Sequence, residues 1–124
     1  MKTKGTLLAA TLALFVLVGA GCAAGPSLSL SKTAFSPGET ISVEFTALDS
    51  YADNAWIGII PSDVAHGDEA FNDQFDIDYK YLDGKTSGTL NFVAPEEPGA
   101  YDFRMHDTDT SGKEVASVSF TVAQ

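Results

Sequence analysis

Short segments in which apolar and polar residues alternate constrain the fold of this chain more than any other feature. Residues 27–31, 40–47 and 77–81 all show this alternation. Side chains of a β-strand point to opposite faces of its sheet in turn, so a period of two predicts strands with one buried face. Residues 55–60 form instead an unbroken apolar run near the middle of the chain. That run predicts a strand buried on both faces.

Further strands are expected at residues 88–94, 100–106 and 118–122. Turn-forming pairs such as Pro37-Gly38 and Asp83-Gly84 separate the strands at regular intervals, which is typical of β-sandwiches. Outside the N-terminal segment no stretch has helical periodicity, and only a helical turn around residues 69–72 is expected. The sequence therefore predicts an all-β fold, an immunoglobulin-like Greek-key sandwich of about seven strands over residues 27–124.

Two aromatic residues have predicted places in this sandwich. Glu97, Gly99, Tyr101 and Phe103 have the spacing of a tyrosine corner, which predicts that the Tyr101 hydroxyl bonds to backbone upstream. The alternative is that Tyr101 is only a core aromatic residue. Trp56 is expected to fill the space between the sheets, as the tryptophan of an immunoglobulin third strand does. Its alternative is an exposed position, where it and neighbouring aromatic residues stack against sugar rings.

The N-terminus has the organisation of a secretory signal. Lys2 and Lys4 precede an uncharged apolar segment at residues 7–18, and small residues then lead to Cys22, the only cysteine. The apolar segment is shorter than a membrane-spanning helix requires. The sequence therefore predicts export from the cytoplasm.

A lone cysteine directly after small residues resembles the bacterial lipoprotein signal. The resemblance implies a signal peptide at residues 1–21, acylation of Cys22 including palmitate, and a short tether at residues 22–26. Ala23, rather than Asp, resembles the pattern of outer-membrane sorting in a Gram-negative cell. The alternative is ordinary secretion with a free Cys22 thiol.

Three motifs resemble an immunoglobulin-like module of bacterial secreted and envelope proteins that is related to the SKICH type. They are a Pro-Gly-Glu turn at residues 37–39, the Ala-Trp-Ile-Gly-Ile strand at 55–59 and Pro-Gly-Ala-Tyr-Asp-Phe-Arg at 98–104. The resemblance covers residues 27–123, although Ala55 stands where the family has an acidic residue. It implies a non-catalytic accessory or interaction module and transfers no catalytic residue.

Acidic residues dominate the mature chain. Removal of Lys2 and Lys4 with the signal leaves five basic against seventeen acidic residues, which disfavours nucleic acid and anionic lipid as partners. From residue 33 to residue 79 there is no Lys or Arg. We expect a docking face for a protein partner that carries basic residues, and the alternative is an ordinary solvated surface. The acidic residues of this face are Asp63, Asp68, Glu69, Asp73, Asp76 and Asp78.

Two sets of carboxylates raise the alternative of a calcium site. Asp107, Asp109 and Ser111, with Gly112 at the sixth position, match the opening of a calcium loop, since Ca²⁺ prefers oxygen ligands at alternate positions. The twelfth position holds Val118 instead of a bidentate Glu, so a simple hairpin turn with Gly112 at positive φ is the competing interpretation. The second set is Asp68, Glu69 and Asp73.

No residue set has catalytic spacing. The chain has two histidines, no nucleophile-elbow motif and too few soft ligands for a zinc site. The sequence thus predicts a lipid-anchored, non-enzymatic interaction module of the bacterial envelope. A carbohydrate- or calcium-binding accessory module is the alternative.

Overall fold

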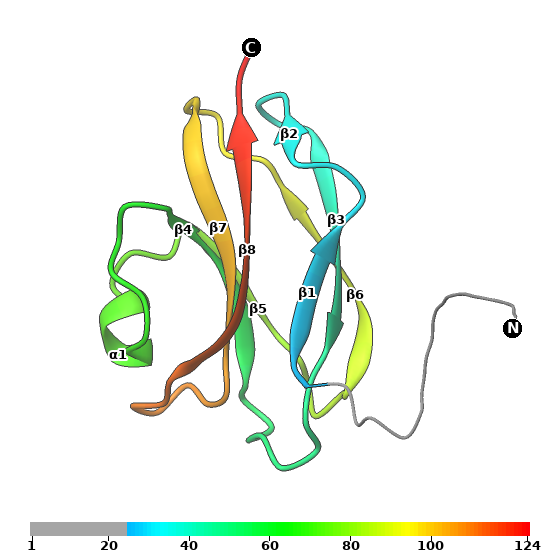
Figure 1. The fold of residues 1–124 in the computed structure, drawn as a ribbon, viewed down its shortest axis with the longest axis vertical. Helices are drawn as coiled ribbons and strands as arrows, with labels where there is room; N and C mark the ends of the chain where they lie inside the picture. Colours follow the sequence, from blue (N-terminus) through cyan, green and yellow to red (C-terminus); the bar gives the residue numbers. More distant parts are fainter. Residues whose placement is uncertain (1–24) are drawn as a thin grey trace, which may run out of the picture.

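The computed structural model describes residues 25–124, which form two facing β-sheets (Figure 1). One sheet has the order β1-β3-β6, with β1 at Ser27–Leu30, β3 at Thr40–Thr46 and β6 at Ser87–Val93. The other has the order β2-β8-β7-β4-β5, with β2 at Ala34–Phe35, β8 at Glu114–Val122, β7 at Gly99–His106, β4 at Trp56–Pro61 and β5 at Asp78–Tyr81.

This strand order confirms the predicted immunoglobulin-like sandwich. In immunoglobulin lettering the two sheets are A-B-E and A′-G-F-C-C′, and neighbouring strands are antiparallel except for the parallel pair β2 and β8. The described chain has eight strands rather than about seven. The additional strand, β2, has two residues, too few for an alternating pattern to reveal.

The core between the sheets is built from the inward positions of the alternating strands. Phe45 of β3 and Phe103 of β7 are almost completely buried, and Phe103 stacks on Phe120 of β8 at 4.8 Å between ring centroids. The predicted tyrosine corner is confirmed: the Tyr101 hydroxyl donates a hydrogen bond to the carbonyl oxygen of Glu97 at 2.6 Å. These contacts fix the start of β7 against β8.

The central strand β4 is buried on both faces, as its apolar run predicts. Ile57 and Ile59 belong to the core between the sheets. Trp56 therefore points the other way, to the outer face of the five-stranded sheet, and the expectation that it fills the space between the sheets is wrong. Gly58 lies beside it on the same face, where a side chain would collide with the indole ring.

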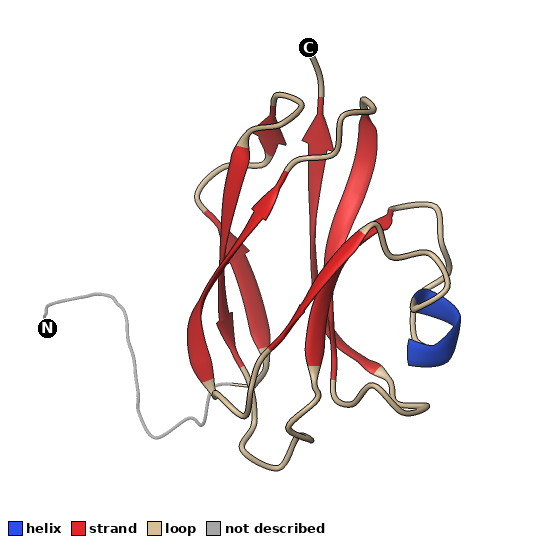
Figure 2. Ribbon diagram, turned by 180° about the vertical axis from the view of Figure 1, so that it is seen from behind, coloured by secondary structure: helices blue, strands red, loops and turns tan. Residues whose placement is uncertain are grey.

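The segment from Pro61 to Ile77 covers this outer face. It contains the one predicted helical turn, α1 (Glu69–Asn72), which lies on the side of the five-stranded sheet away from β1, β3 and β6 (Figures 1 and 2). Beneath the segment, the outward residues Asp102, Arg104 and His106 of β7 are all buried. The protein thus has a second buried layer, and this layer is polar.

Candidate functional site

Arg104 is the centre of the polar layer. Its side chain is fully buried, and its Nε and Nη2 donate hydrogen bonds to Oδ2 of Asp102 at 3.0 and 2.8 Å. Nη2 also donates to the carbonyl oxygen of Val64 at 2.8 Å, and Nη1 donates to Oδ1 of Asn72 at 2.9 Å and to the carbonyl oxygen of Ala65 at 3.2 Å. One guanidinium therefore joins β7 to the covering segment at two places, residues 64–65 and the end of α1.

Asp102 is the counter-ion of Arg104. Burial raises the pKa of its carboxyl, but hydrogen bonds from Arg104, Ser62 and Ser119 together outweigh burial and hold that pKa below its ordinary value. Both serine hydroxyls donate to Oδ1 at 2.8 Å. The carboxylate is thus ionised, and both of its oxygens accept hydrogen bonds within the layer.

His66 closes the layer at its solvent side. Its Nε2 accepts from Nη2 of Arg104 at 3.2 Å, because a guanidinium can only donate. Nδ1 then carries the proton that is donated to Oε2 of Glu114 at 2.7 Å. The other carboxylate oxygen of Glu114 accepts from the Gly67 amide at 3.2 Å, so β8 also holds the covering segment.

Trp56 and His106 form the second half of the layer. Their rings stack at 4.0 Å between centroids with an interplanar angle of 24°. Both ring nitrogens of His106 are buried without a hydrogen-bond partner in the described chain. Burial, helped by the charge of Arg104, lowers the pKa of His106 to about 4, although the carboxylate of Glu114 and those of the following turn act in the opposite direction. His106 is therefore a neutral ring at ordinary pH.

The carboxylate of Glu69 reaches the same layer from α1. Its Oε2 accepts from Nε1 of Trp56 at 3.1 Å, and its Oε1 accepts from the Gly112 amide at 3.3 Å. Burial raises the pKa of this carboxyl, and the nearby carboxylates of Asp73 and Asp109 raise it further. The three side chains offer one oxygen each within 4.8 Å of one another. This carboxylate group (Glu69, Asp73 and Asp109) has the hard oxygen donors that Ca²⁺ takes.

The group joins parts of the two calcium sets expected from the sequence. Asp109 comes from one set and Glu69 and Asp73 from the other, whereas neither Asp107 nor Asp68 belongs to any such group among residues 25–124. Asp68 instead caps α1, since its Oδ1 accepts from the Ala70 amide at 3.1 Å. These two carboxylates have local structural partners.

The turn after His106 is a hairpin turn held by its own side chains. Oδ1 of Asp107 accepts from the Lys113 amide at 3.0 Å. The hairpin interpretation expected Gly112 at positive φ. The residue in the left-handed region is instead the exposed Ser111, with φ of 53°. Gly112 is needed for a different reason: a side chain there would collide with Asp107 and Thr108.

Large apolar side chains surround the carboxylate group at the surface. Phe75, Ile77 and Tyr79 are 42%, 51% and 48% exposed, and Phe71 and Tyr81 are exposed to a similar extent. The Tyr81 hydroxyl donates to Oδ2 of Asp109 at 2.7 Å, and this bond raises the pKa of Tyr81 to about 12. Tyr81 therefore adjoins the carboxylate group directly.

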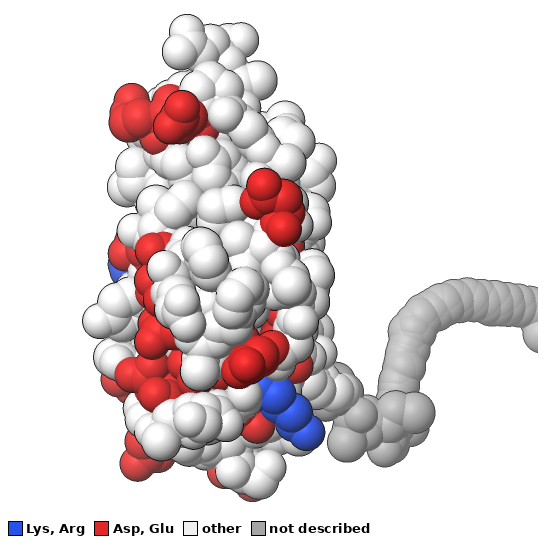
Figure 3. Space-filling model, turned by 90° about the vertical axis from the view of Figure 1, so that its left-hand side faces the viewer, with Lys and Arg blue, Asp and Glu red and all other residues white. Residues whose placement is uncertain are grey.

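Asp73, Asp76 and Asp78 complete this surface. Burial raises the pKa of Asp73 and of Asp76, and the repulsion of neighbouring carboxylates adds to both shifts. Viewed from the α1 side, the surface carries many Asp and Glu side chains, and Lys and Arg occupy only small areas near its edges (Figure 3). The acidic aromatic face, as we call it, consists of Phe71, Asp73, Phe75, Asp76, Ile77, Asp78, Tyr79, Tyr81 and Asp109.

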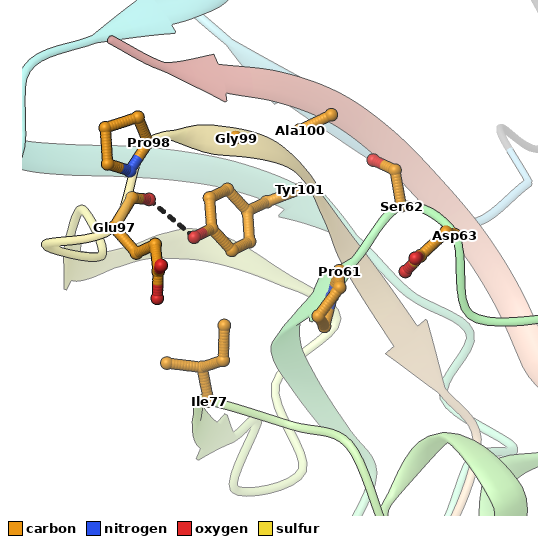
Figure 4. A pocket seen from close by; sticks show the side chains of 9 residues that line it. All are labelled: Pro61, Ser62, Asp63, Ile77, Glu97, Pro98, Gly99, Ala100 and Tyr101. Carbon is orange, nitrogen blue, oxygen red and sulfur yellow. Dashed lines mark hydrogen bonds between the residues drawn. The ribbon is translucent and has the colours of Figure 1, made fainter. Parts of the chain in front are cut away.

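Of the six predicted docking residues, Asp73, Asp76 and Asp78 are on this face, whereas Glu69 is buried, Asp68 caps α1 and Asp63 lines a separate hollow. With Pro61, Ile77, Glu97 and the ring of Tyr101, Asp63 lines this open hollow of about 710 Å³ (Figure 4). The Tyr101 hydroxyl points to the Glu97 carbonyl, so it is occupied by the tyrosine corner. Ile77 belongs to both surfaces, and the hollow therefore adjoins the acidic aromatic face.

Comparison with models of protein families gives no match, and comparison with curated proteins gives none either. Within residues 25–124 there is no helix with the length and apolar character needed to span a bilayer. Cys22 and the predicted signal peptide lie outside the described residues.

Proposed function

We propose that this protein is a lipid-anchored, non-catalytic docking module of the bacterial envelope, and that its acidic aromatic face binds a protein partner with basic residues. The observation that carries the proposal is the exposure of Phe75, Ile77 and Tyr79 among carboxylates. A cluster of large exposed apolar side chains on a soluble domain is typical of an interaction site. The carboxylates give that site a charge preference, because they attract a cationic partner and repel an acidic one.

The geometry of the rings favours a protein over a sugar. The planes of Tyr79 and Tyr81 meet at 78°, and those of Phe71 and Phe75 at 56°. A sugar ring stacks on a flat platform, whereas rings at steep angles to one another leave recesses that side chains fill. The polar groups of the face are mostly carboxylates, which accept hydrogen bonds but do not donate them. Such groups suit the ammonium and guanidinium groups of Lys and Arg.

The polar layer supports a non-catalytic role. The hydroxyls of Ser62 and Ser119 donate to the carboxylate of Asp102, and no histidine accepts their protons. The carboxylate that accepts these hydrogen bonds is bound to Arg104 and its pKa lies below the ordinary value, so it is a poor base for activating a serine as a nucleophile. The side chains of Arg104 and Asp102 form their hydrogen bonds with residues of the folded chain, and these bonds stabilise the fold. The anchoring part of the proposal rests on the signal pattern that ends at Cys22 and on the resemblance to envelope modules.

The test is affinity capture from envelope extract with the immobilised protein, at low and at high salt. Wild type should retain a basic protein at low salt and release it as ions screen the face. The variant Asp73→Asn/Asp76→Asn removes two charges from the face, and Tyr79→Ser removes an exposed ring. Both variants should lose the captured protein.

The matched control is Glu44→Gln/Glu96→Gln, which changes the net charge equally at exposed positions away from the face. It should retain the partner. Equal loss from the control and from Asp73→Asn/Asp76→Asn would mean that net charge alone attracts the protein, and capture that persists in both face variants would reject the face as the binding site.

A calcium-binding function is the second candidate, and the convergence of Glu69, Asp73 and Asp109 favours it. Bound Ca²⁺ stabilises the folded state by mass action, so CaCl₂ should raise the melting temperature relative to a sample with EDTA. Asp73→Asn should abolish the rise and Asp107→Asn should leave it intact. Unchanged melting of wild type in millimolar CaCl₂ would eliminate this candidate.

A further inference from the structure

The edge strand β5 suggests how the partner binds. We infer that an extended segment of the partner adds to β5 as a further antiparallel or parallel strand of the five-stranded sheet, with basic residues among its side chains. This inference rests on the proposed function and specifies its partner. It makes backbone hydrogen bonds, and not side-chain contacts alone, part of the interaction.

The first support is the position of β5 in the sheet. Among the strands of residues 25–124, it is the last in the order β2-β8-β7-β4-β5 and pairs only with β4. All four residues of the strand are exposed. An uncovered edge strand offers a row of unpaired amide and carbonyl groups to another chain.

The register shows which backbone groups are free. Leu82 donates from its amide to the carbonyl oxygen of Ala55 at 2.9 Å, and the register continues with Lys80 opposite Ile57. In an antiparallel pair alternate residues bond to the neighbouring strand, so Tyr79 and Tyr81 direct their backbone groups away from β4. Their side chains belong to the acidic aromatic face. The free backbone edge and the proposed docking face are therefore parts of one surface.

The amide of Tyr79 supports this assignment. It donates to Oδ1 of Asp78, the preceding residue, at 2.8 Å. An amide paired within the sheet would not need this local acceptor. A carbonyl oxygen of an added strand can take the place of the Asp78 oxygen and leave that carboxylate free for a basic side chain.

Charge decides between a partner and a second copy of this chain. Pairing β5 with β5 of another copy can place Lys80 opposite Asp78, but it would also bring the two acidic aromatic faces together, and each whole chain carries a formal charge of −10. Like charges on adjacent strands are destabilising. Basic side chains that point to the same face as Tyr81 would meet Asp109, and those that point to the other face would lie beside Asp78. Apolar side chains of the added strand would pack beside Tyr79 and Tyr81. The occupant is therefore a basic, extended segment of a different protein.

The test uses two synthetic peptides and the ¹⁵N-labelled mature protein. The first peptide alternates Lys and Val over eight residues with blocked ends. The second has the same side chains and charge but carries N-methyl groups on two adjacent central residues, which blocks hydrogen bonding along both of its edges. The first peptide should bind at low salt and shift the amide resonances of Tyr79 and Tyr81. The second should bind at least about fivefold more weakly, because on whichever of its edges faces β5 one hydrogen bond of about 1 kcal/mol is lost.

The outcomes separate this inference from the proposed function. Equal binding of both peptides with shifts confined to the face would overturn strand addition and leave the docking face intact. Binding with shifts only at other strands would overturn it as well. Failure of both peptides at low salt, together with failure of the capture experiment, would overturn the docking face and the inference together.

Discussion

Replacement of Arg104 by Met should destabilise the protein more than almost any other single exchange. The substitution keeps an apolar side chain of similar length but removes six hydrogen bonds, two of them to the Asp102 carboxylate, whose side chain is 3% exposed. Removal of one partner of a buried ion pair costs about 3–5 kcal/mol, because the other charge stays buried without compensation. For a domain of this size, a loss of about 4 kcal/mol lowers the melting temperature by roughly 15–30 °C.

Urea denaturation followed by Trp56 fluorescence measures this loss of stability with a probe inside the polar layer. Trp56 is the only tryptophan and stacks on His106 within the same layer. The double variant Asp102→Ala/Arg104→Met should lose less stability than Arg104→Met alone, since it removes the unpaired charge as well.

Lys32→Met is the matched control for this experiment. It breaks the surface ion pair between Lys32 and Glu39, where the lysine side chain is 52% exposed, and should leave the denaturation midpoint almost unchanged. If Arg104→Met proves no more destabilising than Lys32→Met, the polar layer does not hold the covering segment and the reasoning about it fails.

Three further predictions concern single residues. Tyr101→Phe should cost about 1 kcal/mol in urea denaturation, because it removes the buried hydroxyl of the tyrosine corner, and an unchanged midpoint would contradict that role. Folding lowers the pKa of His106 from 6.5 to about 4, so the unfolded state takes up the proton first as the pH falls. The contribution of the neutral ring to the free energy of unfolding is therefore complete above pH 6.5 and is lost progressively down to about pH 4. Between pH 7 and pH 5 wild type should therefore lose about 2 kcal/mol more of its free energy of unfolding than His106→Phe, measured in EDTA. The raised pKa values of Glu69 and Asp73 act in the opposite sense and are common to both proteins, and parallel pH profiles would refute the assignment. Cys22→Ser should move the protein from the membrane to the soluble fraction, and a variant that stays in the membrane would exclude acylation of Cys22 as the anchor.

The strands were predictable because their signal is local. Along residues 40–47 and 100–106, the alternation of apolar and polar residues indicates which side chains point inward and pack in the core. The spacing of the tyrosine corner indicates where β7 begins. The covering of the outer face was not predictable in this way. Asp102 and Arg104 occupy the polar positions of an alternating strand, which is also the pattern of a solvent-exposed face. Only the tertiary fold shows that a segment some forty residues earlier lies over them.

The candidate site was predictable in its parts but not in its assembly. The sequence marks both the acidic segment and the turn after His106, and each interpretation assumed that ligands lie close together in sequence. The structure instead joins Glu69 and Asp73 of one segment with Asp109 of the other. Trp56 was expected between the sheets by analogy with the tryptophan of an immunoglobulin third strand. The apolar run did not contradict this, because it cannot show which face a residue takes when both faces are buried.

The polar layer explains how an acidic segment can be held in one place. The carboxylates between Pro61 and Ile77 repel one another, so the segment needs a cation beneath it, and the only Arg of the chain supplies one. Arg104 holds the backbone at Val64 and the side chain of Asn72, and Asn72 is the last residue of α1. With α1 fixed in this way, the rings and carboxylates of the acidic aromatic face keep their positions. If this face docks a partner as proposed, loss of Arg104 should weaken that binding even though its own side chain never reaches the surface.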